Sequence, residues 1–183
     1  MFDPTAFDNM KTVLEGAVYD QDLEGAILVT NRNDLLDLAQ LSRCFKIDLQ
    51  LRPIKQGTES TITASLVLRS SLENFAAELL SSENPSIWKN AGANLKIQFA
   101  IPMQLPSLDS IQKLTSLLKK QWGENREIII KEEKTFENAV YRDSLIYSTV
   151  QFARLVTEDQ LEDLFELVNH VIKSLEELES FTS

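Results

Sequence analysis

The sequence predicts an α+β fold: one antiparallel sheet of about five to six strands, with helices packed mainly on one face. Two observations lead to this prediction. Three segments alternate between apolar and polar residues, which is the pattern of strands with one buried and one wet face. The last 27 residues, 157–183, repeat apolar positions at helical spacing and predict a long amphipathic C-terminal helix. The length suits one domain over residues 1–183.

The three alternating segments are the clearest strands. A strand with one buried face places every second side chain in the core, so the apolar positions identify the covered face. We expect a hairpin around Gly57 between the first two segments. The apolar positions are Phe45, Ile47, Leu49 and Leu51, then Ile62, Ala64, Leu66 and Leu68, then Leu95, Ile97, Phe99 and Ile101.

The N-terminal part begins with a predicted helix, for which Asp3 is the N-cap and Pro4 the first helical residue. Its apolar face is Phe7, Met10, Leu14 and Ala17, and we expect it to fray within residues 16–20. Residues 26–30 form a short apolar run typical of a strand. Residues 31–41 fit either a short helix capped by Asn33 or an extended segment.

Two further helices follow from capping signals. Ser70 and Glu73 have the spacing of a capping box, and the helix after them is expected to bury its apolar residues. Ser107 caps the next helix, which Gly123 ends. The residues expected to be buried in the first of these helices are Leu72, Phe75, Ala76, Leu79 and Leu80.

The C-terminal third supplies two more predicted strands, over residues 128–130 and 144–156, joined by a polar connection over residues 131–143. Thr157 and Gln160 then form a second capping box, which starts the long helix. Its apolar stripe is Leu161, Leu164, Val168, Val171, Leu175 and Leu178. This stripe is wider than the seam of a two-stranded coiled coil, so it favours packing across a sheet.

The composition excludes several classes of protein. A net charge of −10 and a pI near 4.6 oppose binding to nucleic acid or to an anionic membrane surface. No apolar run is long enough to span a membrane, and the N-terminus lacks the pattern of a secretory signal. Cys44 is the single cysteine, which fits a reducing compartment. We therefore expect a cytoplasmic protein.

The sequence predicts no catalytic residue, metal ligand or cofactor-binding residue. His170 is the single histidine, so a zinc site with several nitrogen or sulfur ligands is not expected. Cys44 and His170 could act as nucleophile and base only if the fold brought them together. The basic residues near Trp122 fit the last turn of a helix better than a nucleic-acid surface; they are Lys113, Lys119, Lys120 and Arg126.

The C-terminal helix provides the candidate partner-binding residues. Residues 157–183 contain eight acidic residues and one basic residue, Lys173. Acids near the C-terminal end of a helix interact unfavourably with its dipole, which hints at a use beyond folding. A basic surface on another protein would satisfy them. The residues chosen for this role are Glu162, Glu166, Glu176, Glu177 and Glu179.

The second half of the chain, residues 108–181, has the predicted order helix, strand, strand, long acidic helix, with Val156-Thr157 just before the acidic helix. This layout resembles that of the small acidic chaperones of type III secretion and the related YbjN-type regulators. The resemblance implies a homodimer that clasps an extended segment of a client protein.

The leading hypothesis is a non-catalytic protein-binding module, regulatory or chaperone-like, that uses the acidic C-terminal helix, the sheet surface or both. The alternative is a small-molecule-binding or enzymatic α+β domain. Its cleft would lie between sheet and helices and would be lined by Trp88, Trp122 or Cys44.

Overall fold

The computed structural model describes residues 5–53, 62–80, 90–104 and 106–182. Asp3, Pro4, Gly57 and Trp88, which the sequence analysis singled out, lie outside these residues. The elements in chain order are α1 (Ala6–Leu23), β1 (Ile27–Asp37), β2 (Ser42–Leu51), β3 (Thr63–Ser70), α2 (Leu72–Leu80), β4 (Asn94–Pro102), α3 (Leu108–Trp122), β5 (Glu127–Glu137), β6 (Val140–Gln151) and α4 (Leu161–Thr182).

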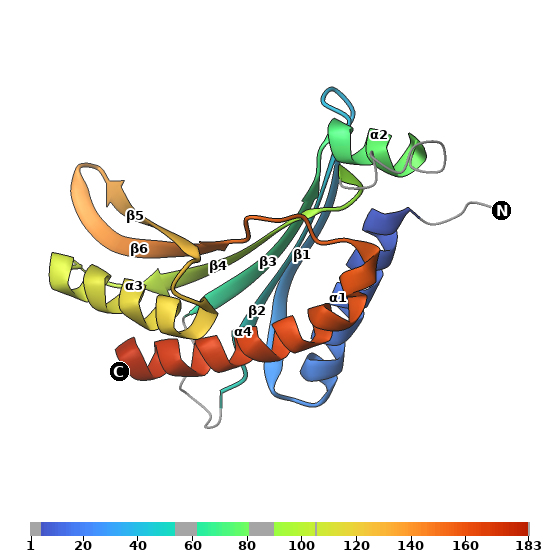
Figure 1. Ribbon diagram of the computed structural model, residues 1–183. Coiled ribbons are helices and arrows are strands. Elements are labelled where there is room, and N and C mark those ends of the chain that lie inside the picture. The colour runs from blue at the N-terminus through green and yellow to red at the C-terminus, as the bar shows by residue number, and fades with distance from the viewer. Residues whose placement is uncertain (1–4, 54–61, 81–89, 105, 183) are drawn as a thin grey trace.

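The strands form one antiparallel sheet in the order β1-β2-β3-β4-β6-β5. Figure 1 shows α1, α3 and α4 on one face of this sheet and α2 at one end of it. The opposite face carries no helix in the part of the chain that the structure describes. The predicted fold class is confirmed: an α+β fold with a six-stranded antiparallel sheet, helices mainly on one face and a long C-terminal helix.

The core lies between the sheet and its helix layer, and the three alternating segments supply the floor of this core. Phe45, Ile47 and Leu49 of β2 are fully buried, whereas Cys44 and Lys46, whose side chains alternate with theirs, point to the other face. From α4, the buried residues are Leu164, Val168, Val171, Ser174, Leu175 and Leu178. The apolar stripe predicted from helical spacing therefore does face the sheet.

Residues 31–41, for which the sequence allowed helix or strand, continue β1 as far as Asp37 and then turn. The Asp37 carboxylate accepts hydrogen bonds from the backbone N–H groups of Ala39 (2.9 Å) and Gln40 (3.0 Å), an arrangement that favours a turn over a helix. Leu41 completes the turn with a φ of 51°. The extended alternative is therefore the right one.

The connection predicted over residues 131–143 is wrong, because β5 and β6 extend through it as a long hairpin. Glu137 pairs with Val140, and the two residues between them, Asn138 and Ala139, have φ values of 50° and 65°. Two successive positive φ values define the type I′ turn that matches the twist of a hairpin. Side chains on both faces of the distal part are exposed, so no apolar alternation marks it in the sequence.

Helix α1 is longer than predicted and does not fray within residues 16–20, since it continues to Leu23. Thr5 is its N-cap, and its hydroxyl accepts a hydrogen bond from the backbone N–H of Asp8. The face of Phe7, Met10, Leu14 and Ala17 is buried as expected. Val18 adds one more apolar side chain to that face.

The path from β6 into α4 runs close to the segment that precedes β4. Ala93 and Val156 exchange two backbone hydrogen bonds, of 2.9 and 2.8 Å. A Cβ atom placed on the neighbouring Gly92 would lie 2.5 Å from the carbonyl oxygen of Val156. Only glycine allows the two backbones to approach so closely. The Thr157–Gln160 capping box then opens the C-terminal helix, as predicted.

Candidate functional site

Helix α2 packs differently from the sequence prediction, since of the five residues expected to be buried only Phe75 and Ala76 are even half-buried. Leu72, Leu79 and Leu80, which were expected in the core, are exposed by 48%, 61% and 48%. The buried residues of the helix are instead Asn74 and Ala77. A helix normally turns its apolar side inward, so this arrangement leaves an apolar surface without a partner in the described part of the chain.

Polar contacts explain why α2 adopts this orientation. The hydroxyl of Ser71 accepts a hydrogen bond from the Asn74 backbone N–H, and the Asn74 side-chain oxygen accepts one from the Ser71 backbone N–H (2.9 Å). The Asn74 amide also donates to the carbonyl oxygen of Asn90 (2.9 Å). The capping box therefore lies one residue later than the predicted pair, Ser70 and Glu73. Its buried Asn74 fixes which side of the helix faces inward.

The turn between β1 and β2 contributes further exposed leucines at the same end of the sheet. Arg43, which follows this turn, pairs with Ser70, which precedes α2, and Figure 1 shows the turn beside α2. We name six exposed leucines of β1, the turn and α2 the leucine surface. They are Leu36, Leu38 and Leu41 from β1 and the turn, and Leu72, Leu79 and Leu80 from α2.

Acidic groups lie around the leucine surface. Asp37 belongs to the turn and Glu73 is exposed on the first turn of α2. Glu78, on the inner side of α2, is half-buried; burial raises the pKa of its carboxyl above the ordinary value, although the charge of Arg43 and a hydrogen bond from the Phe7 backbone oppose this. Against these acids, Arg69 at the end of β3 is the exposed basic residue nearest to α2 along the described chain, so acidic groups are in the majority here.

Arg43 does not relieve this acidity, because it is already paired. Its guanidinium lies 4.5 Å from the ring centroid of Phe7, donates to the Thr5 hydroxyl (2.8 Å) and forms an ion pair with Asp8. Burial opposes ionisation of Asp8, but the hydrogen bond from Thr5 and the charge of Arg43 outweigh it and lower the pKa of that carboxyl.

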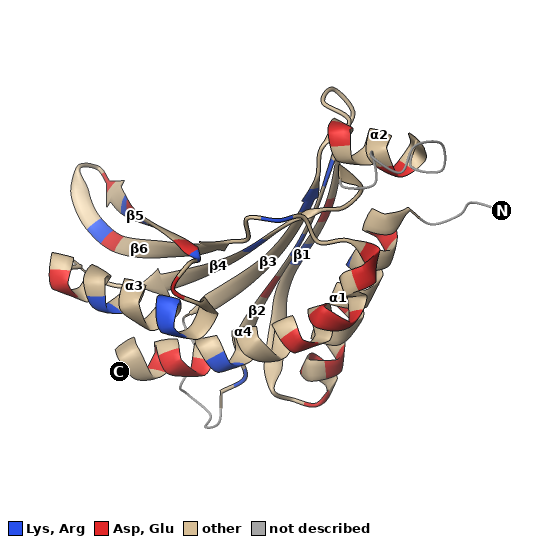
Figure 2. Ribbon diagram, viewed as in Figure 1, with Lys and Arg blue, Asp and Glu red and all other residues tan. Residues whose placement is uncertain are grey.

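The predicted partner-binding residues lie along α4. Glu162, Glu166, Glu176 and Glu177 are exposed, while Glu179 is half-buried. Figure 2 shows acidic residues along both α1 and α4. The acidic face of α4 is thus turned away from the core, as the sequence predicted, and its role in binding remains a prediction.

Cys44 and His170 are not brought together. Cys44 points to the uncovered face of the sheet, because the side chain of its neighbour Phe45 faces the core. His170 is on α4, in the helix layer, where its ring contacts the end of α3. A nucleophile–base pair of these two residues is therefore excluded by the fold.

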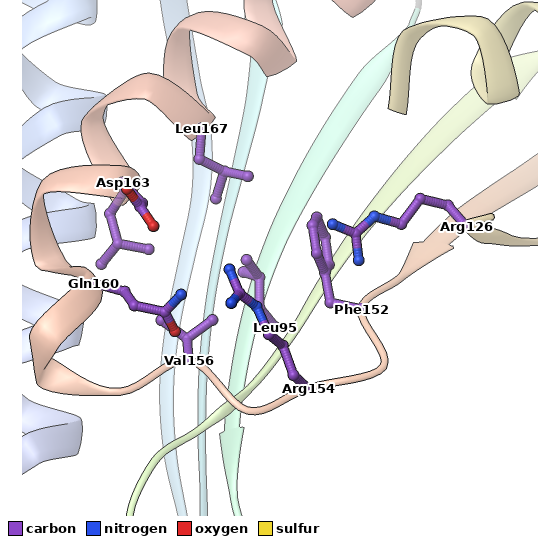
Figure 3. A pocket seen from close by; sticks show the side chains of 9 residues that line it. Leu95, Arg126, Phe152, Arg154, Val156, Gln160, Asp163 and Leu167 are labelled. Atoms are coloured by element: carbon purple, nitrogen blue, oxygen red, sulfur yellow. The ribbon is translucent and has the colours of Figure 1, made fainter. Parts of the chain in front are cut away.

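A pocket of about 160 Å³ lies between the start of β4, the segment after β6 and the first turns of α4. Figure 3 shows Arg154 reaching from the segment after β6 toward α4, and Arg126 lying against the ring of Phe152. No local sequence pattern marks this pocket, because its residues come from four separate segments. They are Leu95, Arg126, Phe152, Arg154, Val156, Gln160, Asp163, Leu164 and Leu167.

An aromatic cluster supports one side of the pocket. The ring of Trp122 packs edge-to-face against Phe152 (6.1 Å between centroids) and against His170 (4.3 Å). Trp122 thus lies behind the pocket instead of lining it as the alternative hypothesis expected, and Cys44 is on the other face of the sheet. Of the basic residues predicted near Trp122, only Arg126 reaches the pocket, and Lys113 pairs with Asp109 (2.6 Å).

Comparisons with protein-family models, curated proteins and solved structures found no match. The predicted order helix, strand, strand, helix over residues 108–181 is confirmed by α3, β5, β6 and α4, whereas the family resemblance built on it stays a hypothesis. Within the described residues, no helix combines the length and the apolar character needed to cross a membrane.

Proposed function

We propose that this protein binds another protein and that the leucine surface is the docking site for a basic amphipathic segment of that partner. One observation carries the proposal: α2 buries Asn74 while Leu72, Leu79 and Leu80 face outward. Fully burying an exposed leucine side chain contributes about 1.5–3 kcal/mol, and these three, being about half exposed, would each contribute about half of that on binding.

The charge around this surface indicates the kind of partner. Asp37 and Glu73 adjoin the leucines, and the chain as a whole carries a net charge of −10. A second copy of the chain would bring like charges together, whereas a segment with lysines or arginines beside its apolar residues would be attracted. We therefore favour a basic partner over self-association. The acidic face of α4, including Glu162 and Glu166, would strengthen the same preference at longer range.

Two synthetic helical peptides with the same leucine pattern test the proposal, one with lysines and the other with glutamates on the polar face. We expect the lysine peptide to bind in titration calorimetry and the glutamate peptide to bind at least about tenfold more weakly. Replacing both Leu79 and Leu80 by Gln should lower the affinity for the lysine peptide by about tenfold or more, because the substitutions remove exposed apolar area.

The matched control replaces Leu23 and Leu108 by Gln, since both are exposed but lie outside the leucine surface. This control variant should bind the lysine peptide as the unchanged protein does. Equal binding of both peptides, or equal effects of the two double variants, would contradict the proposal. Light scattering provides a separate check: a concentration-dependent dimer that Leu79→Gln abolishes would show that the surface serves a second copy.

A further inference from the structure

We propose that the pocket lined by Arg126 and Arg154 binds a small organic monocarboxylate that has an apolar body. This site uses different residues from the leucine surface, and the two proposals stand independently. The pocket offers an apolar floor and two arginines that form no ion pair with the described residues, in a protein whose other charges are mostly acidic.

The two arginines differ from most of the others in the chain. Four arginines form ion pairs with carboxylates: Arg32 with Glu15, Arg43 with Asp8, Arg52 with Asp22 and Arg142 with Glu137. Arg126 and Arg154 form none with the described residues, although acidic residues outnumber basic ones by 28 to 18. An external anion would complete the coordination of these two guanidinium groups.

A contact with an aromatic ring holds Arg126 at the pocket. Its guanidinium lies over the Phe152 ring, 4.6 Å from the ring centroid. This contact attracts the cation without using a carboxylate. The N–H groups of the guanidinium therefore stay available for the carboxylate of a ligand. Phe152 is in turn held by Trp122, which fixes this side of the pocket.

The floor selects for an apolar body on the ligand. Leu95, Val156 and Leu164 are buried and form the base of the pocket. Leu167 and Phe152 are half-buried and supply the apolar surface that a ligand could still cover. A bare phosphate or sulfate ion would leave this lining in contact with water, whereas a branched or aromatic carboxylate would cover it.

The balance of charge indicates a single negative charge on the ligand. Asp163 is the one acidic residue of the lining, so the two arginines leave one positive charge uncompensated. The first turn of α4 adds the positive end of a helix dipole. Gln160 contributes an amide whose oxygen accepts from the Thr157 backbone N–H (3.4 Å), which leaves the amide N–H groups for the ligand.

Four probes test the inference by titration, with tryptophan fluorescence as a second signal. We expect 4-methylpentanoate to bind with a Kd below about 1 mM, and 4-methylpentan-1-ol and inorganic phosphate to bind at least about tenfold more weakly. Leucine, which adds an ammonium group to the same body, shows whether Asp163 tolerates or favours a zwitterion. The affinity for leucine is compared with the affinity for 4-methylpentanoate, and the binding of 4-methylpentanoate decides the proposal.

Variants connect the binding to these residues. Arg154→Gln is the first choice, because Arg154 is exposed and its loss should leave the fold intact. We expect Arg154→Gln and Arg126→Gln each to lower the affinity for 4-methylpentanoate by about tenfold. Leu167→Trp should block binding, because the larger side chain fills the pocket. Arg142→Gln, which makes the same charge change on the β5–β6 hairpin, is the control and should bind normally.

Specific outcomes would overturn the inference. One is that the alcohol binds as tightly as the carboxylate, which would mean that the arginines contribute nothing. Another is that the double variant of Arg126 and Arg154 keeps the affinity of the unchanged protein. A third is the absence of saturable binding by any probe, while circular dichroism shows a folded protein.

Discussion

The Nε2 atom of His170 lies 3.0 Å from the carbonyl oxygen of Gln121, near the C-terminal end of α3. A carbonyl oxygen only accepts hydrogen bonds, so Nε2 carries the proton and donates. The same imidazole packs edge-to-face on Trp122 at 4.3 Å. His170 therefore joins α4 to α3, which gives the single histidine of the chain a structural role.

Replacing His170 by Ala should lower the free energy of unfolding by about 1–3 kcal/mol, because a hydrogen bond and an aromatic contact are lost together. Chemical denaturation followed by circular dichroism measures the change. Asn169→Ala, at the adjacent exposed position of α4, is the control and should have little effect. Equal stability of the two variants would argue against this role.

Two glycine-to-alanine substitutions should have opposite effects. Gly92→Ala places a Cβ atom 2.5 Å from the Val156 carbonyl oxygen, and the backbones must move apart, at a cost of about 1–3 kcal/mol. Gly16→Ala meets no atom within 4 Å in the middle of α1 and should stabilise the protein by about 0.5–1 kcal/mol. Melting temperatures of the pair provide the test, and a stabilising Gly92→Ala would show that this close approach is not required.

Neighbouring serines distinguish the two candidate caps of α2. Ser71→Ala removes the hydroxyl that accepts from the Asn74 backbone and should destabilise the protein by about 1 kcal/mol. The Ser70 hydroxyl is buried and has no hydrogen-bond partner among the described residues, so Ser70→Ala should stay within about 0.5 kcal/mol or stabilise the protein. If Ser70→Ala were the more destabilising of the two substitutions, the capping box predicted from Ser70 and Glu73 would be supported instead.

Glu78→Gln should stabilise the protein at neutral pH. The pKa of the Glu78 carboxyl is raised in the folded state. Its contribution to the stability of the folded state is therefore fully present below the unfolded pKa, near the ordinary value of 4.5. This contribution is lost as the pH rises through the folded pKa. Glutamine has no charge to desolvate, and it can still accept from the Phe7 backbone. The free energy of unfolding of the Glu78→Gln variant and of the unchanged protein should be measured as a function of pH. The variant should be more stable above the folded pKa of Glu78 and about equally stable below the unfolded pKa. A gain that persisted at low pH would assign the effect to packing.

Periodicity predicted the elements that pack against the core. The strands of Phe45, Leu66 and Ile97 alternate because one face is covered, and the stripe of α4 repeats because it crosses that face. The same reasoning failed for α2, where the buried Asn74 satisfies backbone groups and the leucines turn outward. Apolar spacing identifies an apolar face, but it does not say whether this chain or another one covers it.

The candidate sites depend on contacts that no local pattern encodes. Arg126 and Arg154 are separated by the whole β5–β6 hairpin, and they line one pocket because β6 returns beside β4. The hairpin itself escaped prediction because its turn uses Asn138 and Ala139 where glycine is the usual signal. Sequence reasoning thus located the acidic face of α4 but neither the pocket nor the orientation of α2.

The charged composition of β5 also affects how copies of the protein behave at high concentration. As a terminal strand, β5 leaves backbone N–H and C=O groups open to a strand from another molecule. Lys131, Glu132, Glu133 and Lys134 follow one another along it, and a foreign strand that added there would have to desolvate these charges. The β5 edge of the sheet is thereby protected against edge-to-edge aggregation.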